Sequence, residues 1–243
     1  KVHVDQKNLV TNLPMAQIQI GGLPFSIDGS LDQDSLHFHI ASKSIQLTDA
    51  VEKFSIDRDN HLKNLSGSGA LDFDLLLEGG TGAMDPIDIA CNFSIENGKI
   101  TEPSEHLTFD DIQMEGHYIR KDSTVEELIL KAVSFESETG PFKGHLSVLD
   151  FENPKFVGFA KGTINLKSAH RIFNIPEFDQ INGRLQVFCD FEAIKREGSD
   201  VQLKRCSGDV AIKSSNFKLE EDKREFKDVN GHLKFTTRDV RVK

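Results

Sequence analysis

The sequence predicts a mainly β protein: an extended, twisted antiparallel sheet or groove, built from two internal repeats of about 117 residues with one short helix each. Three observations lead to this prediction. Apolar and polar residues alternate over most of the chain, which is the pattern of strands with one dry face and one wet face. Pairs rich in Gly and Asn lie between or beside the alternating segments, as turns do. The chain also aligns with itself after a shift of 117 residues.

The alternation predicts strands along both halves of the chain. In the first half, the apolar positions are Ile18 and Ile20; Leu36, Phe38 and Ile40; Leu71, Phe73, Leu75 and Leu77; and Ile87, Ile89, Cys91, Phe93 and Ile95. In the second half, they are Leu128 and Leu130; Leu146 and Val148; Leu185, Val187, Cys189 and Phe191; Val210 and Ile212; and Leu233 and Phe235. The pairs expected to be turns are Gly21-Gly22, Asp28-Gly29, Gly79-Gly80, Asn97-Gly98, Asn153-Pro154, Asn182-Gly183 and Asn230-Gly231.

Two short segments instead have apolar residues along one side of a helix. The first contains Leu47, Ala50, Val51 and Phe54 with Thr48 and Asp49 as candidate caps, and the second contains Leu166, Ala169, Ile172 and Phe173 with Ser168 as candidate cap. They lie 119 residues apart, so each repeat is expected to have one helix.

The repeat divides the chain into residues 1–122 and 123–243. The shift of 117 residues pairs Pro24-Phe25 with Pro141-Phe142, Phe93 with Val210, Ile95 with Ile212, and Phe109, Asp111 and Ile112 with Phe226, Asp228 and Val229. Repeats of this kind bury their apolar faces against their neighbours and extend in one dimension. Val2 and Val4 at one end and Val240 and Val242 at the other continue the strand pattern, so we expect both repeats to belong to a longer sheet.

The composition argues against several classes of function. The net charge of -10 and the scattered Lys and Arg residues oppose binding to a phosphate backbone, so no nucleic-acid partner is expected. No apolar segment approaches the roughly 18 residues that a membrane-spanning helix needs. The 18 Phe residues, against one Tyr and no Trp, favour dry contacts over the recognition of sugars.

No motif indicates a metal, a cofactor or a catalytic site, and we expect the protein not to be an enzyme. His37 and His39 share the strand face opposite Phe38, but no third ligand for zinc is evident. Carboxylate pairs such as Asp72 and Asp74 are expected to be solvated on an outer face, where their acidity is ordinary.

A second metal motif also fails. Asp57-x-Asp59-Asn60 begins like a calcium loop, but Leu62 and Ser68 stand where that loop needs Gly and Glu. We therefore interpret this segment as a turn.

The cysteines fit no zinc motif or disulfide framework. Cys91 and Cys189 take aliphatic positions in alternating strands, where a free Cys acts as a small apolar residue. A bridge between Cys189 and Cys206 stays open. A hairpin turn at residues 195–200 would place the two opposite each other, but the apolar phase slips near Arg205, and they could then face different sides.

Several segments resemble the AsmA family of bacterial envelope proteins. They are Gly140-Pro141-Phe142-Lys143-Gly144-His145-Leu146, Phe151-Glu152-Asn153-Pro154-Lys155, Gly162-Thr163-Ile164-Asn165-Leu166, Ile181-Asn182-Gly183-Arg184-Leu185, Asn12-Leu13-Pro14 and Pro24-Phe25-Ser26-Ile27. The resemblance covers nearly the whole chain. It implies a periplasmic segment of a protein that is anchored in the inner membrane and related to bridge-like lipid-transfer proteins with long β-grooves. It also implies phospholipid or another envelope lipid as ligand, and outer-membrane assembly components as candidate partners.

The resemblance favours a non-enzymatic groove that binds or conducts lipid acyl chains in outer-membrane biogenesis. The candidate lipid-contacting residues are Leu71, Phe73, Leu75, Leu77, Ile89, Phe93, Ile95, Leu185, Val187, Phe191, Val210 and Ile212. The alternative is a structural or scaffold protein of the cell envelope with a closed apolar core and no lipid ligand. Alternation does not separate these two hypotheses, because the same residues can line a groove or fill a core.

Overall fold

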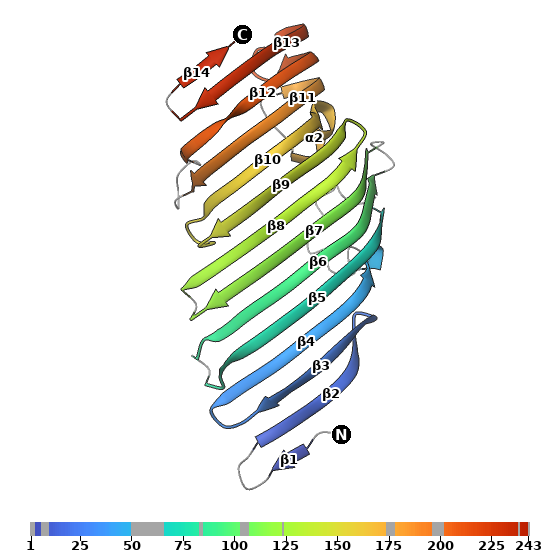
Figure 1. Cartoon of the computed structure of the whole chain (residues 1–243), viewed down its shortest axis with the longest axis vertical. Coiled ribbons are helices and arrows are strands. Elements are labelled where there is room, and N and C mark those ends of the chain that lie inside the picture. The colour runs from blue at the N-terminus through green and yellow to red at the C-terminus, as the bar shows by residue number, and fades with distance from the viewer. Residues whose placement is uncertain are drawn as a thin grey trace.

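The computed structural model describes residues 3–5, 10–49, 66–82, 85–102, 107–122, 124–173, 178–195, 202–237 and 239–242. Its strands form one antiparallel sheet in which neighbours in the sequence are also neighbours in space, from β1 to β14 in order. Figure 1 shows the strands stacked along the long axis of the molecule, with the two termini at opposite ends. The mainly β prediction is confirmed.

The elements have the following bounds: β1 His3–Asp5, β2 Val10–Ile20, β3 Leu23–Leu31, β4 Ser35–Gln46, β5 Ser66–Gly80, β6 Ile87–Glu102, β7 Leu107–Lys121, β8 Val125–Ser137, β9 Gly140–Leu149, β10 Lys155–Asn165, α2 Leu166–Phe173, β11 Phe178–Ile194, β12 Gln202–Leu219, β13 Glu225–Thr236 and β14 Asp239–Val242. Each predicted alternating segment therefore lies in a strand. Residues 47–49 are helical, and the rest of the first predicted helix lies outside the described residues.

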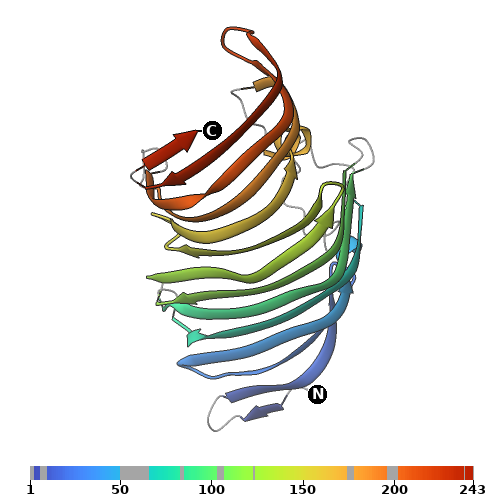
Figure 2. The same ribbon diagram turned by 45° about the horizontal axis from the view of Figure 1, so that its top comes forward.

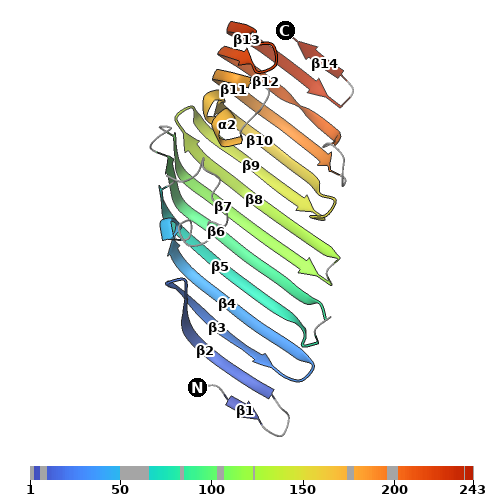
Figure 3. The same ribbon diagram turned by 180° about the vertical axis from the view of Figure 1, so that it is seen from behind.

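The helix α2 occupies the second predicted helical segment, but its cap differs from the prediction. The Oδ1 atom of Asn165 accepts hydrogen bonds from the backbone N–H groups of Lys167 and Ser168, at 3.0 and 3.3 Å. Asn165 is thus the N-cap, not Ser168. We call the side of the sheet where the strands end near α2 and residues 47–49 the helix edge, and the opposite side, where they end near residues 32–34, 122, 124 and 150–154, the far edge. Figure 3 shows α2 in front of the strand ends at the helix edge.

The sheet is open and single-layered in the described part of the chain. The extensive contacts between elements join sheet neighbours, or join α2 to β10 and β11. The molecule exposes 15808 Å², whereas a compact monomer of 27.2 kDa would expose about 10,900 Å². The additional exposed area is expected for a single sheet that has no second layer packed against either face.

Four of the pairs predicted as turns lie in the interior of strands, and for these the prediction was wrong; a fifth pair, Gly79-Gly80, forms the last two residues of β5, directly before the turn. Asp28-Gly29 belongs to β3, Asn97-Gly98 to β6, Asn182-Gly183 to β11 and Asn230-Gly231 to β13. The pairing register shifts on either side of Gly98, next to Gly183 and opposite Asn230. The strands therefore continue through these Asn-Gly pairs as bulges or beside bulges, rather than reversing direction.

Three of the bulges use one hydrogen-bonding arrangement. Each places a residue in the left-handed region, namely Ser44 (φ 57°), Ser214 (φ 47°) or Asp228 (φ 48°), and leaves its N–H without a ladder partner. A side chain on the neighbouring strand accepts that N–H: Asp72 for Ser44 at 2.7 Å, Asn230 for Ser214 at 2.8 Å and Asn216 for Asp228 at 2.8 Å.

Most of the bulges lie in the half of the strand that leads to the helix edge, as at Ser42/Ile45, Ser68/Ala70 and Ile212/Ser215. The bulges at Leu13/Ala16 and Glu192/Ala193 lie toward the far edge. Bulges increase the local twist and bend the strands that contain them. Figure 2 shows the strands of the first half, blue to green, curving strongly near this edge. The sheet is therefore bent on the same side along several successive strands, as a trough requires.

Candidate functional site

The candidate lipid-contacting residues all lie on one face of the sheet, which we call the apolar face. In the first half, Leu71 pairs with Ile95, Phe73 with Phe93, and Leu77 with Ile89, while Leu75 pairs with Cys91. In the second half, Leu185 pairs with Ile212, Val187 with Val210, and Phe191 with Cys206. Because side chains on one face recur every second residue, these cross-strand pairs define one continuous side of β5, β6, β11 and β12.

The strands between these two patches continue the same face. In β7 and β8, Tyr118 pairs with Leu128, and Met114 with Val133. In β9 and β10, Val148 pairs with Phe156, and Leu146 with Gly158. Apolar side chains therefore connect the two patches across every strand from β5 to β12.

Most of this face is half-buried rather than buried. Among the candidate residues, Ile95 is buried, at 9% exposed, and the other eleven have intermediate exposure. Apolar-face residues in β2 and β3, near the N-terminal end of the sheet, are more open, with Ile20 at 45% and Leu31 at 41%. Partial burial comes from the lateral packing of neighbouring side chains within one layer.

Two compact clusters lie toward the helix edge of the first half. Leu23, Phe25 and Ile45 form one, and Leu47, Ile95 and Ile112 form the other. Leu71 contacts both clusters from the side. Here the first residues after β4 fold back onto the apolar face and give this region a conventional core.

Phenylalanine rings lie flat across glycines on this face. A Cβ atom added at Gly116 would lie 2.1 Å from the ring of Phe93, and one added at Gly158 would lie 2.6 Å from the ring of Phe191. Phe142 covers Gly162 in the same way, at 2.6 Å. Aromatic side chains that cover a cross-strand glycine protect the backbone and leave a low, smooth apolar surface.

The three cysteines lie on the apolar face and are free. Cys189 pairs with Gly208 and Cys206 pairs with Phe191, so the two cysteines are diagonal neighbours on the same side. Diagonal positions lie about 7–8 Å apart, beyond the usual span of a disulfide. Burial raises the pKa of the Cys91 thiol to about 11, which suits the small apolar residue that the sequence predicts.

The histidines and carboxylates considered in the sequence lie on the opposite, polar face. His37 contacts Glu78 at 2.8 Å, and His39 lies 3.3 Å from Asp28 and 3.0 Å from Asp74. The hydrogen bond with Asp74 raises the pKa of His39, and the one with Asp28 adds to the effect. These contacts connect β4 to its two neighbours, β3 and β5, on the polar face.

The described residues contain no group of three or more His, Cys, Asp or Glu side chains able to hold a metal ion. The residues of the calcium-like motif, from Asp57 to Leu62, lie outside the described part of the chain.

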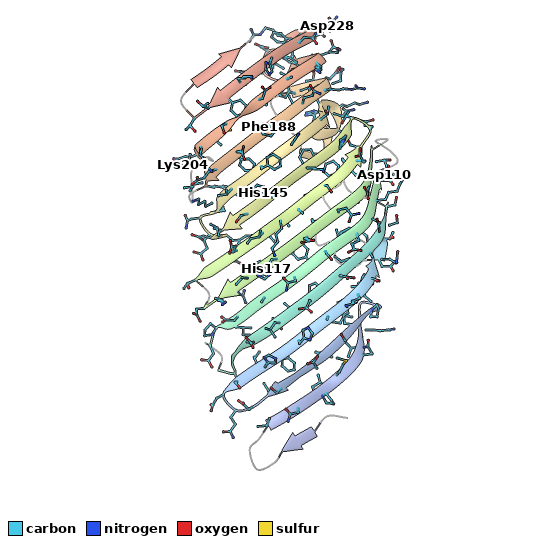
Figure 4. The ribbon with its side chains drawn as sticks, viewed as in Figure 1. Asp110, His117, His145, Phe188, Lys204 and Asp228 are labelled. Atoms are coloured by element: carbon cyan, nitrogen blue, oxygen red, sulfur yellow. The ribbon has the colours of Figure 1, made fainter. Side chains whose placement is uncertain are left out.

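The polar face also carries an aromatic row that sequence reasoning missed. The rings of His145 and Phe159 are stacked at 5.7 Å, and Phe159 meets Phe188 edge-on at 5.9 Å. Phe188 is 46% exposed, and Lys161 lies 6.0 Å from its ring centre. Figure 4 shows His145 and Phe188 near the middle of the sheet. The signal was available: Phe188 stands in the polar phase of its strand.

Comparisons with known proteins give no match, whether by family model, by curated sequence or by solved structure. Within the described residues, no helix is both long enough and apolar enough to span a bilayer.

Proposed function

We propose that this chain is a non-enzymatic groove segment that binds or conducts lipid acyl chains along its apolar face. The observation that carries the proposal is the half-exposed apolar face, which runs from β5 to β12 with no second layer over it in the described part of the chain. A soluble monomer rarely leaves so large an apolar patch without a ligand or partner.

The energetics favour acyl chains as the occupant. Each buried methylene contributes about 0.8 kcal/mol. A chain of about twelve carbons with half of its surface covered would therefore contribute about 5 kcal/mol. The flat rings of Phe93, Phe142 and Phe191 over their glycines support this proposal. A smooth surface offers contact to flexible acyl chains, whereas a protein core needs side chains that interdigitate with those of a second layer.

The proposal includes two repeats, residues 1–122 and 123–243. Bulge residues support it: Asn97 and Ser214 are both left-handed and lie 117 residues apart, and so do Asp111 and Asp228. The resemblance to the AsmA family supports a periplasmic location, a full-length protein anchored in the inner membrane, and a role in outer-membrane biogenesis with envelope lipid as ligand.

Native cysteine labelling tests the groove. Cys189 and Cys206 are half-buried on the apolar face, so bound acyl chains should cover them. Dioleoylphosphatidylcholine at about ten times its Kd should slow maleimide labelling of both thiols about tenfold. The matched control is Ser207→Cys, which places a thiol on the polar face beside Cys206; its labelling rate should not change.

The scaffold alternative makes the opposite prediction. If the apolar face were a closed core, lipid would leave all labelling rates unchanged. That result, or equal protection of Ser207→Cys, would contradict the groove.

A further inference from the structure

Two charged side chains interrupt the apolar face near the far edge. Arg120 of β7 pairs directly with Glu126 of β8, and on its other side it pairs with Ile89. Tyr118, the single tyrosine of the chain, precedes them on the same face. Outside the bulges, every other strand side chain described on this face is uncharged. A charge pair at this position is therefore an exception to the pattern of the whole sheet.

The geometry leaves part of this cluster unsatisfied. The hydroxyl of Tyr118 donates a hydrogen bond to Glu126 Oε1 at 2.6 Å. Arg120 is half-buried, and its Nε atom is buried without a hydrogen-bond partner. Arg120 and Glu126 form no ion pair in the described part of the chain, although they face each other. Leaving a buried N–H donor unpaired is costly, so an acceptor supplied by a ligand would stabilise this position.

The position of Tyr118, Arg120 and Glu126 indicates which kind of ligand could supply an acceptor for Arg120. Phe151, in the turn after β9, meets the ring of Tyr118 edge-on at 6.1 Å and is 44% exposed. The cluster therefore sits where the apolar face reaches the turns of the far edge and water. An amphiphile whose chains lie on the apolar face would place its headgroup at such a boundary.

The charges of Arg120 and Glu126 limit which class of headgroup fits the site. The planar guanidinium group is the side chain that best matches a phosphate. A purely anionic headgroup would also face the carboxylate of Glu126, which repels it. A headgroup with a phosphate and a neighbouring ammonium satisfies both residues.

We propose that Arg120, Glu126 and Tyr118 hold the zwitterionic headgroup of a phospholipid, with the phosphate at Arg120 and the ammonium at Glu126. Tyr118 keeps the Glu126 carboxylate in place. This inference rests on the proposed groove, since the acyl chains of the same lipid lie along the apolar face.

Ligand retention tests the assignment. The whole chain is loaded from mild detergent with phosphatidylethanolamine, phosphatidylglycerol or diacylglycerol, all with oleoyl chains, or with soluble glycerophosphoethanolamine. Native mass spectrometry then counts the retained ligand. The unmodified protein should retain phosphatidylethanolamine about tenfold better than diacylglycerol, with phosphatidylglycerol between them and the soluble compound lost.

The variants separate the two charges. Arg120→Gln should lower both phospholipids to the level of diacylglycerol, and Glu126→Gln should remove the preference for phosphatidylethanolamine over phosphatidylglycerol. Arg120→Lys keeps the charge without the planar fork, which guards against a folding defect, and should keep a reduced preference. The matched control is Arg184→Gln on the polar face, which should change nothing.

The outcomes distinguish this inference from the proposed function. Equal retention of the three lipids, or an unchanged order in both the Arg120→Gln and Glu126→Gln variants, would overturn the headgroup site and leave the groove standing. Retention of the soluble compound at the level of the lipid would also overturn it. Retention of no lipid at all would remove both proposals.

Discussion

The two halves of the sheet carry similar residues at the same spacing but bury them differently. Phe25 is 5% exposed and Ile45 is 3% exposed, whereas Phe142 and Ile164, which lie 117 and 119 residues later, are half-buried. The same contrast separates Leu47, Ile95 and Ile112 from Leu166, Ile212 and Val229. The apolar pattern of a strand thus determines on which face of the sheet a residue lies. The side chains around that residue determine how deeply it is buried.

The neighbouring strand explains part of the difference. Phe109 of β7 and Phe135 of β8 pack against the cluster that contains Ile112, and β8 runs beside β7 from Lys121 to Phe109. In the second half, β14 pairs with β13 only over Leu233–Thr236, so nothing described lies beside Val229 on that side. In a one-layered sheet, a neighbouring strand completes the burial of the apolar side chains beside it.

The largest expected effect tests this contrast directly. Phe25→Ala removes a buried ring from a compact cluster and should lower the free energy of unfolding by about 3–5 kcal/mol. Phe142→Ala removes the same ring from a half-buried position and should cost about half as much. Urea denaturation of both variants measures the difference. Equal losses would show that the two halves are packed alike.

A second pair of substitutions asks whether the backbone of the two halves is equivalent. Gly69 and Gly183 have φ values of 120° and 116°, and an added Cβ would lie 2.6 Å from the Cα of Gly98 or Ser215, respectively. Gly69→Ala and Gly183→Ala should each cost about 1–3 kcal/mol.

The control for these glycines is Gly140→Ala. Gly140 has a φ of 113°, but an added Cβ meets nothing within 4 Å, so this variant should lose less stability in the same urea titration. A strong effect at only one of the two bulges would break the equivalence.

The third prediction compares core with open face. Leu75 and Phe191 are half-buried, so Leu75→Asp and Phe191→Asp should lower stability by about 2 kcal/mol, as for other half-buried side chains, without loss of the fold, while the lipid recovered with the purified protein falls sharply. Asp74→Asn and Asp190→Asn on the polar face are the matched controls; they should leave the recovered lipid unchanged and lower stability by at most about 0.5 kcal/mol. Loss of the fold in both inward variants, with no lipid recovered from the unmodified protein, would favour the scaffold hypothesis.

The smallest effect concerns the polar face of the first half. The pKa of His39 is raised, chiefly by the hydrogen bond with Asp74. Its contribution to stability is therefore complete below the unfolded-state pKa of His and is lost as pH rises through the folded-state value. The contacts are about a third exposed or more, so the contribution should be at most about 0.5 kcal/mol.

The measurement is the stability difference between the unmodified protein and His39→Gln, which should be larger at acidic than at alkaline pH. In an Asp28→Asn, Asp74→Asn background this pH dependence should disappear. A difference that grows with pH would have the wrong sign for this interaction.

Much of the fold could be predicted from the sequence because period-two alternation is a local signal. It located the strands that carry Leu71 to Leu77 and Leu185 to Phe191 and placed them on the correct face. It failed at Asn97-Gly98, Asn182-Gly183 and Asn230-Gly231, since the same pair suits a turn or a bulge, and only the partner strand decides between them. Asp72, Asn216 and Asn230 were the available signals, as acceptors for the bulge N–H groups.

The sequence by itself determined the strands, the face of each apolar residue and the position of the second helix, because each depends on residues a few positions apart. Only the tertiary structure decided how deeply that face is buried and that Arg120 meets Glu126 upon it. Both depend on the strand that lies alongside, whose register is set by bulges and pairing rather than by local pattern. The headgroup site follows from that register, since a one-residue slip of β8 would turn Glu126 to the polar face.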